Sequence, residues 1–230
     1  MKTIGLLGGI SWQSTVDYYR AINVGVARRL GGMHSAKIVM LSVDFDPIEK
    51  LQHAGDWEGA GEILSGAARN IASAGADCLL ICTNTMHRVF SQIERAIDIP
   101  LLHIADATAE VLLRRDIRTV GLLGTAFTME QEFYKGRLSE RYGLRVLVPD
   151  GEAREIVHNA IYQELCLGEV RPASKAAYLR IIDRLADQGA EGVILGCTEI
   201  GMLVKQSDTP VPLFDTTAIH AERAVEYALR

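Results

Sequence analysis

The sequence predicts an α/β protein made of two similar halves, each a doubly wound parallel sheet. The first observation behind this prediction is a regular alternation of short apolar runs, rich in leucine and β-branched residues, with longer amphipathic stretches. That alternation is typical of parallel strands joined by helices. The second observation is an internal repeat. Residues 75–85 match residues 189–199 at a constant offset of 114, with apolar positions aligned with apolar positions.

The repeat extends beyond its best-conserved part. Residues 3–8 match 119–124 at an offset of 116, and residues 99–101 match 211–213 at an offset of 112. Because only small insertions separate the halves, we expect an N-terminal lobe at 1–115 and a C-terminal lobe at 116–230. The last helix of the first lobe could pack on the second. Two matching loops in a duplicated fold predict a site with two mirror-related sides.

Each predicted strand is a short apolar run bounded by polar or glycine residues. Proline-led runs add one short strand to each half. In chain order we expect strands at 3–7, 37–43, 78–82, 100–102, 119–123, 145–148, 192–195 and 212–214.

The predicted helices are the longer stretches with helical spacing of apolar residues. We expect them at 14–29, 56–74, 105–114, 129–141, 152–166, 172–188 and 217–229. Residues 44–56 lack a clear rhythm and are expected to form a polar loop, which either covers the site or is an ordinary connection.

Composition narrows the class of protein. The chain is 48% hydrophobic and 23% charged, so it can bury a core, and its net charge of −5 comes without a basic stripe. We therefore expect a small-molecule ligand rather than a nucleic acid. No apolar run approaches the ~18 residues of a membrane helix. The four cysteines match no disulfide scaffold, which fits a reducing cytoplasm.

The loops that follow the strands are the predicted ligand site, because ligands of such sheets bind beyond the carboxyl ends of the strands. These loops are small or hydroxylated, and each precedes a helix, whose first backbone N–H groups favour an anion. They span residues 8–11, 83–85, 124–128 and 197–199.

Familiar cofactor motifs are missing. The glycines at 5, 8 and 9 do not form the G-x-G-x-x-G dinucleotide fingerprint, and no Gly-Lys-Ser/Thr ending marks a P-loop. Cys78 and Cys82 share one face of a strand, with only His87 nearby as a further metal ligand, so buried, reduced core thiols are the better reading. We expect neither a metal nor a nucleotide.

Cys197 is the leading chemical candidate. It stands where a buried strand gives way to a helix start, a position expected to lower the thiol pKa, so its thiolate could act as a base or nucleophile. The alternative is a small buried thiol. A Cys-His hydrolase would need an activating histidine. His87 is a candidate, but it could equally be a capping or structural residue.

Four segments resemble the aspartate/glutamate racemase family. They are Ile-Gly-Leu-Leu-Gly-Gly-Ile-Ser-Trp at 4–12, Thr-Asn-Thr-Met-His at 83–87, Leu-Gly-Cys-Thr-Glu-Ile at 195–200 and Pro-Leu-Phe-Asp-Thr-Thr-Ala-Ile-His-Ala at 212–221. The resemblance spans essentially the whole chain. It looks closest to bacterial amino-acid racemases that act on acidic substrates.

The resemblance implies two α/β lobes related by pseudo-twofold symmetry, with the substrate in the cleft between them. It also implies no pyridoxal phosphate, metal or nucleotide, and family members are commonly dimers. Each lobe usually offers a cysteine, one on either face of the substrate's α-carbon. One takes the α-proton, and the other returns a proton from the opposite side.

This sequence departs from that pattern at one position, because Thr83 stands where the first cysteine is usual. Cys82 is one residue away and should face the core. A threonine hydroxyl can donate a proton, but as a base it would have to become an alkoxide. Cys197 should therefore deprotonate the L isomer, with Thr83 as the proton donor on the D side. Since L and D isomers have equal free energy, kcat/KM for the complete cycle must be equal in the two directions. The poor base on the D side therefore predicts a weak racemase, with fast α-proton exchange on the L side.

The resemblance also implies contacts with the substrate. Gln52, in the 44–56 segment, is the predicted partner of the side-chain carboxylate. Family members that prefer acidic substrates often place a cation there, but this segment has no arginine and only Lys50, so neutral amino acids stay open. The predicted contacts to the α-carboxylate or amino group are Asn84, Thr85 and Thr198, together with Ser11 and Thr125.

Two alternatives follow from the missing cysteine. Relatives with one of the two cysteines act as decarboxylases of substituted malonates, whereas relatives with both act as hydantoin racemases or maleate isomerases. A second alternative is a non-catalytic protein that binds a dicarboxylate.

Overall fold

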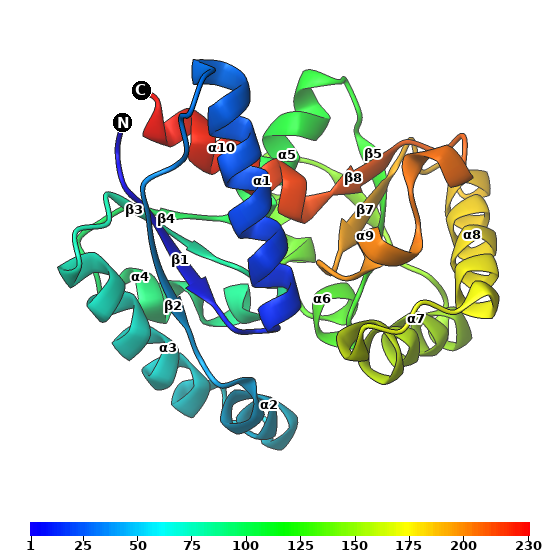
Figure 1. The fold of residues 1–230 in the computed structure, drawn as a ribbon. Helices are drawn as coiled ribbons and strands as arrows, with labels where there is room; N and C mark the ends of the chain where they lie inside the picture. Colours follow the sequence, from blue (N-terminus) through cyan, green and yellow to red (C-terminus); the bar gives the residue numbers. More distant parts are fainter. The chain divides into compact units, whose positions relative to one another are not determined.

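The computed structural model describes residues 1–230 and confirms the α/β fold, with two parallel sheets of four strands each. The strand order is β2-β1-β3-β4 in one sheet and β6-β5-β7-β8 in the other, so both sheets share one topology (Figure 1). Contacts divide the chain into two units. The first unit comprises Met1–Ile104 and His220–Arg230, and the second comprises Ala105–Ile219.

The sheet of the first unit runs through its middle. Its strands are β1 (Ile4–Gly8), β2 (Ile38–Ser42), β3 (Cys78–Ile81) and β4 (Leu101–Leu102). Its helices are α1 (Trp12–Leu30), α2 (Phe45–Ala54), α3 (Trp57–Ser73), α4 (Phe90–Glu94), the 3-10 helix Thr85–Val89, and α10 (Thr216–Ala228), of which residues 220–228 lie in this unit.

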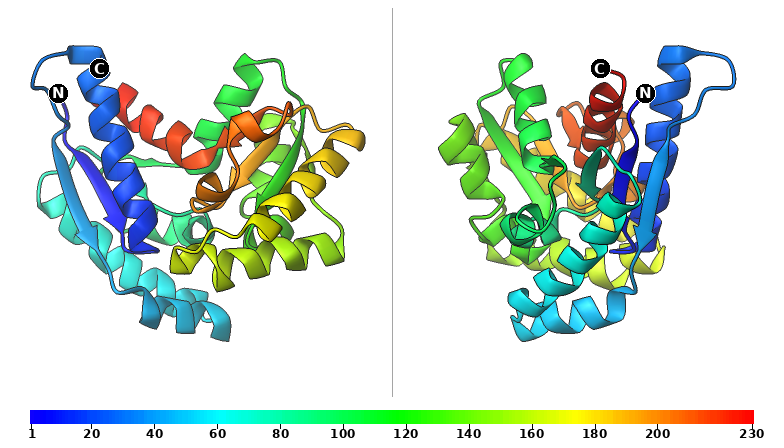
Figure 2. Two further views of the ribbon diagram at one scale, coloured as in Figure 1. Left: turned by 45° about the vertical axis from the view of Figure 1, so that its right-hand side comes forward. Right: turned by 90° about the vertical axis from the view of Figure 1, so that its left-hand side faces the viewer.

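Two apolar clusters cover the two faces of this sheet. On one face, Ile22 of α1 and Val225 of α10 pack with Leu6 and Leu80. On the other face, α3 and α4 run beside the sheet (Figures 1 and 2). Their residues pack with Leu7 and with residues of β3. The strands are nearly continuous apolar runs because both faces of the sheet are buried.

The second unit repeats the pattern. Its strands are β5 (Thr119–Gly124), β6 (Arg145–Leu147), β7 (Val193–Gly196) and β8 (Leu213–Asp215). Its helices are α5 (Ile104–Arg114), of which residues 105–114 lie in this unit, α6 (Ala126–Glu130), α7 (Gly151–Gln163), α8 (Pro172–Asp187) and α9 (Ile200–Leu203). A π-helix lies at Arg137–Arg141, and 3-10 helices lie at Leu165–Leu167 and Gln206–Asp208.

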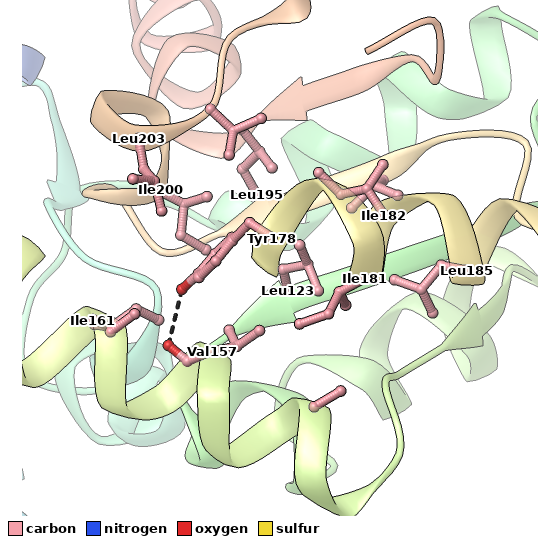
Figure 3. Close-up of a cluster of buried hydrophobic side chains, with 14 of the residues drawn as sticks. Leu123, Val157, Ile161, Tyr178, Ile181, Ile182, Leu185, Leu195, Ile200 and Leu203 are labelled. Atoms are coloured by element: carbon pink, nitrogen blue, oxygen red, sulfur yellow. Dashed lines mark hydrogen bonds between the residues drawn. The ribbon is translucent and has the colours of Figure 1, made fainter. Parts of the chain in front are cut away.

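Tyr178 of α8 lies at the centre of the apolar core of this unit (Figure 3). Its ring packs among side chains that include Leu195 of β7 and Ile200 of α9, and its hydroxyl donates to the Val157 carbonyl of α7 at 2.8 Å. This bond satisfies a buried polar group that would otherwise be costly. The core thus supports the residues on either side of Cys197.

Residues 44–56 are not the polar loop that the sequence led us to expect, because α2 fills most of this segment. Asp44 caps the helix by accepting the Asp46 N–H, and Gly55 ends it in a left-handed conformation. Pro47 falls in the first turn, where its missing N–H is tolerated. Ile48 and Gln52, one turn apart, form the buried side.

The predicted helix at 129–141 is also wrong as a single element. α6 ends at Glu130, and Gln131 takes an extended backbone before the chain turns into the π-helix. Buried Tyr134 lies between the two helices. The remaining predicted helices and strands agree with the structure to within a few residues.

The two units do not follow the midpoint of the repeat. Contacts group residues 105–114 with the second unit and residues 220–230 with the first, whereas the repeat predicted lobes at 1–115 and 116–230, with the last helix of the first lobe able to pack on the second. No helix of the structure combines the length and the apolar character needed to cross a membrane.

Candidate functional site

In the first unit, the Thr83 loop lies beside the loop that follows β1. Leu7 pairs with Ile81 in the parallel ladder, and the Cys82 N–H donates to the Leu7 carbonyl at 2.9 Å, so both loops leave the sheet at the same edge. The Ser14 hydroxyl joins them, because it lies 2.9 Å from the Ser11 carbonyl and 3.0 Å from the Cys82 carbonyl.

The predicted site residues of the first unit occupy different depths. Thr83 and Ser11 are partly exposed, whereas Asn84 and Thr85 are buried. Ser11 caps α1 with its hydroxyl. Gln52 lies on the buried side of α2, whose Ile48 belongs to the same apolar cluster as Ile10 and Met86.

Cys82 is fully buried and shares an apolar cluster with Cys78, as the strand periodicity predicted. Burial raises the pKa of the Cys78 thiol to about 12 and raises the pKa of the Cys82 thiol as well. Both thiols therefore stay protonated near neutral pH, and neither can replace the residue at position 83 as an acid–base group.

In the second unit, two paired glycines bring the Thr125 and Cys197 loops together. Gly124 of β5 lies opposite Gly196 of β7, and a Cβ on Gly124 would come 2.8 Å from the Gly196 carbonyl oxygen. Only glycine allows this approach. The next residues are Thr125, which caps α6 with its hydroxyl, and Cys197.

The Cys197 thiol has a carboxylate as its neighbour. It donates to Oε2 of Glu199 at 2.9 Å, and the Thr198 hydroxyl donates to the same oxygen at 2.6 Å. The Glu199 side chain is buried, with only 4% of the residue exposed, so these two bonds hold a charge that water hardly reaches. Charge-assisted bonds of this kind are short and strong. Nearby, Thr216 fixes the end of β7 by donating to the Leu195 carbonyl at 2.9 Å.

Burial and the charge of Glu199 raise the pKa of the Cys197 thiol well above its ordinary value. The expectation that a helix start would lower this pKa is therefore wrong. The helix that follows, α9, contains only four residues, so few backbone dipoles are aligned with the sulfur. The Glu199 N–H favours the thiolate, but this effect is smaller than those of burial and of the carboxylate.

Glu199 is the residue that the sequence reasoning missed. It was part of the Cys-Thr-Glu loop, and its signal was the carboxyl group two residues after the thiol. His87, the candidate activating histidine, lies in the first unit and bonds the Thr83 carbonyl with Nδ1 at 2.8 Å.

The structure thus assembles the predicted residues into two sets. Ser11, Thr83, Asn84 and Thr85 lie at the carboxyl edge of the first sheet, and Thr125, Cys197 and Thr198 lie at that of the second. Gln52 comes from α2 instead. No group of three or more His, Cys, Asp or Glu side chains in residues 1–230 is arranged to hold a metal ion.

The molecule is thus an α/β protein with two parallel sheets of the same strand order, which carry hydroxyl groups at the carboxyl edge of one sheet and a thiol at that of the other. The family model described as Asp/Glu/hydantoin racemase matches residues 7–224. The chain therefore belongs to the Asp/Glu/hydantoin racemase family, which confirms the resemblance seen in its motifs.

Individual relatives agree with this assignment. A candidate Asp/Glu racemase from Yersinia pestis is 54% identical, with 100% of both chains covered and a TM-score of 0.94. An aspartate racemase homologue from Pyrococcus horikoshii OT3 is 36% identical, also with 100% of both chains covered, at a TM-score of 0.85. The broad specificity amino-acid racemase RacX of Bacillus subtilis (strain 168) is 22% identical over 170 residues, which are 71% of this chain and 69% of RacX. Together they support an amino-acid racemase, an isomerase.

Proposed function

We propose that this protein is a cofactor-independent racemase of L-aspartate and L-glutamate, in which Cys197 removes the α-proton and Thr83 supplies a proton to the opposite face of the α-carbon. The observation that carries the proposal is the bond from the Cys197 thiol to the buried Glu199 carboxylate. A thiol with a raised pKa needs a nearby proton acceptor to become a base, and Glu199 is one at 2.9 Å.

In the proposed mechanism, protons are conserved over one turnover. The Cys197 thiol gives its proton to Glu199, and the resulting thiolate takes the α-proton of the L isomer. The substrate is then a carbanion stabilised by its own carboxylate. The Thr83 hydroxyl donates its proton to the other face and becomes an alkoxide. Glu199 returns its proton to solvent, and Thr83 regains one, which restores the starting state.

Hydroxyl, amide and backbone groups of the loops would bind the substrate. Asn84, Thr85 and Thr198 are the proposed contacts to the α-carboxylate or amino group, with Ser11 and Thr125 beside them. Negative charge builds up on the α-carboxylate as the proton leaves, and donors already fixed around it lower the barrier. Gln52 of α2 is the proposed partner of the side-chain carboxylate.

The two directions are chemically unequal. Proton removal by Cys197 needs a thiolate, whereas removal by Thr83 would need an alkoxide. Equal free energies of the L and D isomers nevertheless require equal kcat/KM values for complete racemisation in each direction. We therefore expect slow racemisation together with fast exchange of the α-proton on the L side.

The test is proton NMR in deuterated water with L- and D-aspartate and L- and D-glutamate. We expect loss of the α-proton signal from the L isomers, much slower loss from the D isomers, and abolition of both by Cys197→Ala. The matched control is Cys166→Ala, which removes the other partly exposed thiol of the second unit and should retain exchange.

Thr83→Cys provides the complementary variant. It restores a thiol at the position where Thr83 aligns with Cys197, so the D isomers should exchange faster than in the original protein. An unchanged rate with the D isomers would exclude Thr83 as the second catalytic group.

One observation favours a second candidate function. Of its two matched loop positions, only one holds a thiol, which is the pattern that the resemblance implies for decarboxylases of substituted malonates. Release of CO2 from an arylmalonate, without α-proton exchange of amino acids, would support that function. Absence of both reactions would favour a protein that only binds a dicarboxylate.

A further inference from the structure

His87 links the Thr83 loop to Ile104, where the first chain segment of its unit, Met1–Ile104, ends. Its Nδ1 lies 2.8 Å from the Thr83 carbonyl oxygen, and its Nε2 lies 3.2 Å from the Ile104 backbone nitrogen. A backbone N–H can only donate, so Nε2 must be the acceptor and Nδ1 must carry the proton. The two partners together define one neutral tautomer.

The surroundings of His87 keep it in that state. Its ring centroid lies 4.6 Å from that of His103, 5.9 Å from that of His220 and 6.0 Å from that of Phe90. Burial lowers the pKa of His87 well below its ordinary value, and the two neighbouring histidines lower it further. No acid or lysine is among these neighbours, so the ring stays neutral at physiological pH.

His220 fixes the adjoining backbone in a similar way. Its Nε2 donates to the Leu102 carbonyl at 2.9 Å, and its Nδ1 accepts from the Tyr18 hydroxyl at 2.8 Å. Leu102 ends β4, two residues before Ile104. The segment that His87 contacts at Ile104 is therefore itself tied to His220, the first residue of the 220–230 segment, and through His220 to Tyr18 of α1.

We propose that His87 is a positioning residue for Thr83. Its Nδ1 sets the backbone there by donating to the Thr83 carbonyl, and the Ile104 N–H fixes the orientation of the ring by donating to Nε2. The inference rests on the proposed role of Thr83 as proton donor. His87 is not itself an acid or base in the reaction, because both of its ring nitrogens are engaged with backbone groups.

A donor that must reach one face of the α-carbon is sensitive to small displacements, since a shift of about 1 Å can cost on the order of a hundredfold in rate. Removal of the proton by Cys197 does not depend on this bond. Misplacement of Thr83 should therefore reduce inversion and spare exchange with retention of configuration. The ratio of these two reactions isolates the role of His87.

Two substitutions separate the two bonds of the ring. In His87→Asn, the side-chain NH2 reaches about as far as Nδ1 and can still donate to the Thr83 carbonyl. In His87→Gln, the longer side chain places an oxygen near the position of Nε2, where it can accept from Ile104, but the donor to Thr83 is lost. L-glutamate in deuterated water is followed by NMR for exchange and by chiral chromatography for D-glutamate.

We expect His87→Gln to lower the ratio of D-glutamate formed to α-proton exchanged by about tenfold or more, and His87→Asn to keep it within about twofold. The ratio compares two reactions of the same folded molecules, so a loss of stability in either variant does not change it. Thermal unfolding monitors that loss separately. Equal ratios in the original protein and in His87→Gln, or an equally low ratio in His87→Asn, would overturn the inference.

Thr83→Ala distinguishes this inference from the proposed function. If Thr83→Ala lowers the ratio and His87→Gln does not, only the positioning role fails. If Thr83→Ala leaves the ratio unchanged, Thr83 is not the proton donor, and both fail.

Discussion

At the scale of single residues, burial and one carboxylate govern the acid–base behaviour of Cys197. Burial raises the pKa of the thiol, and Glu199 raises it further through its charge while accepting the hydrogen bond of the thiol. In the proposed mechanism Glu199 also takes the thiol proton. These effects do not conflict, because transfer of the proton from sulfur to carboxylate moves one negative charge over 2.9 Å without adding another. Thr198 donates to the same oxygen and keeps it in place.

Glu199→Gln separates the two effects. Without the negative charge, the pKa of the Cys197 thiol should fall, so its alkylation by iodoacetamide should begin at lower pH. The α-proton exchange of L-glutamate should nevertheless slow by about a hundredfold, because the amide cannot take the thiol proton. Alkylation rates measured against pH, and NMR exchange rates on the same samples, check both expectations.

Glu152→Gln is the matched control, because Glu152 is exposed at the start of α7 in the same unit. It should change neither the alkylation profile nor the exchange rate. Faster exchange in Glu199→Gln would mean that the supply of thiolate alone limits the reaction and that Glu199 is not the acceptor.

At the scale of elements, the glycines that end β5 and β7, Gly124 and Gly196, set the position of Cys197. A Cβ on Gly196 would come 2.8 Å from Cδ1 of Leu122 and 2.9 Å from the Leu123 carbonyl oxygen. Leu122 can adjust, but the backbone carbonyl belongs to β5 and cannot move alone. Gly196→Ala should therefore push β7 away from β5 just before the Cys197 loop.

We expect Gly196→Ala to lower the free energy of unfolding by about 1–3 kcal/mol, as overpacking in a core does, and to reduce exchange in the fraction that stays folded. Urea unfolding and NMR exchange measure the two effects. Gly66→Ala is the control, since Gly66 lies within α3 and its nearest neighbour would be 3.8 Å away. Alanine there should stabilise the protein by about 0.5–1 kcal/mol. Equal stability of the two variants would contradict this view of the glycine pair.

The sequence predicted the strands well because each is an apolar run with a polar or glycine boundary, and the repeat aligned Thr83 with Cys197. It did not predict α2, because Pro47 and the charged residues around it hide a helix whose buried side has only Ile48 and Gln52 as fully enclosed members. It also gave the wrong direction for the pKa of Cys197. Burial and a contact between side chains decide that pKa, and a motif describes neither.

At the scale of the whole molecule, each unit is completed by a helix from the other half of the sequence. Ala221, Ala224 and Val225 of α10 belong to the apolar cluster that contains β1 and α1, although they lie near the end of the chain. Arg29 of α1 also forms an ion pair with Glu222. A repeat shows which segments resemble one another, but the sheet on which a helix packs depends on the path of the chain.

A substitution near the C-terminus should therefore weaken the N-terminal sheet. Val225 is fully buried in the first unit and Val157 is fully buried in the second, so they form a matched pair. Replacing either with alanine should cost about 2 kcal/mol, between the usual costs of Ile→Val and Leu→Ala. Because local stability differs between cooperative regions, amide exchange resolved by mass spectrometry can assign the loss. Val225→Ala should speed exchange in β1 and β3 by about 30-fold, and Val157→Ala should do so in β5 and β7. Faster exchange in β5 and β7 alone after Val225→Ala would mean that α10 does not complete the first unit.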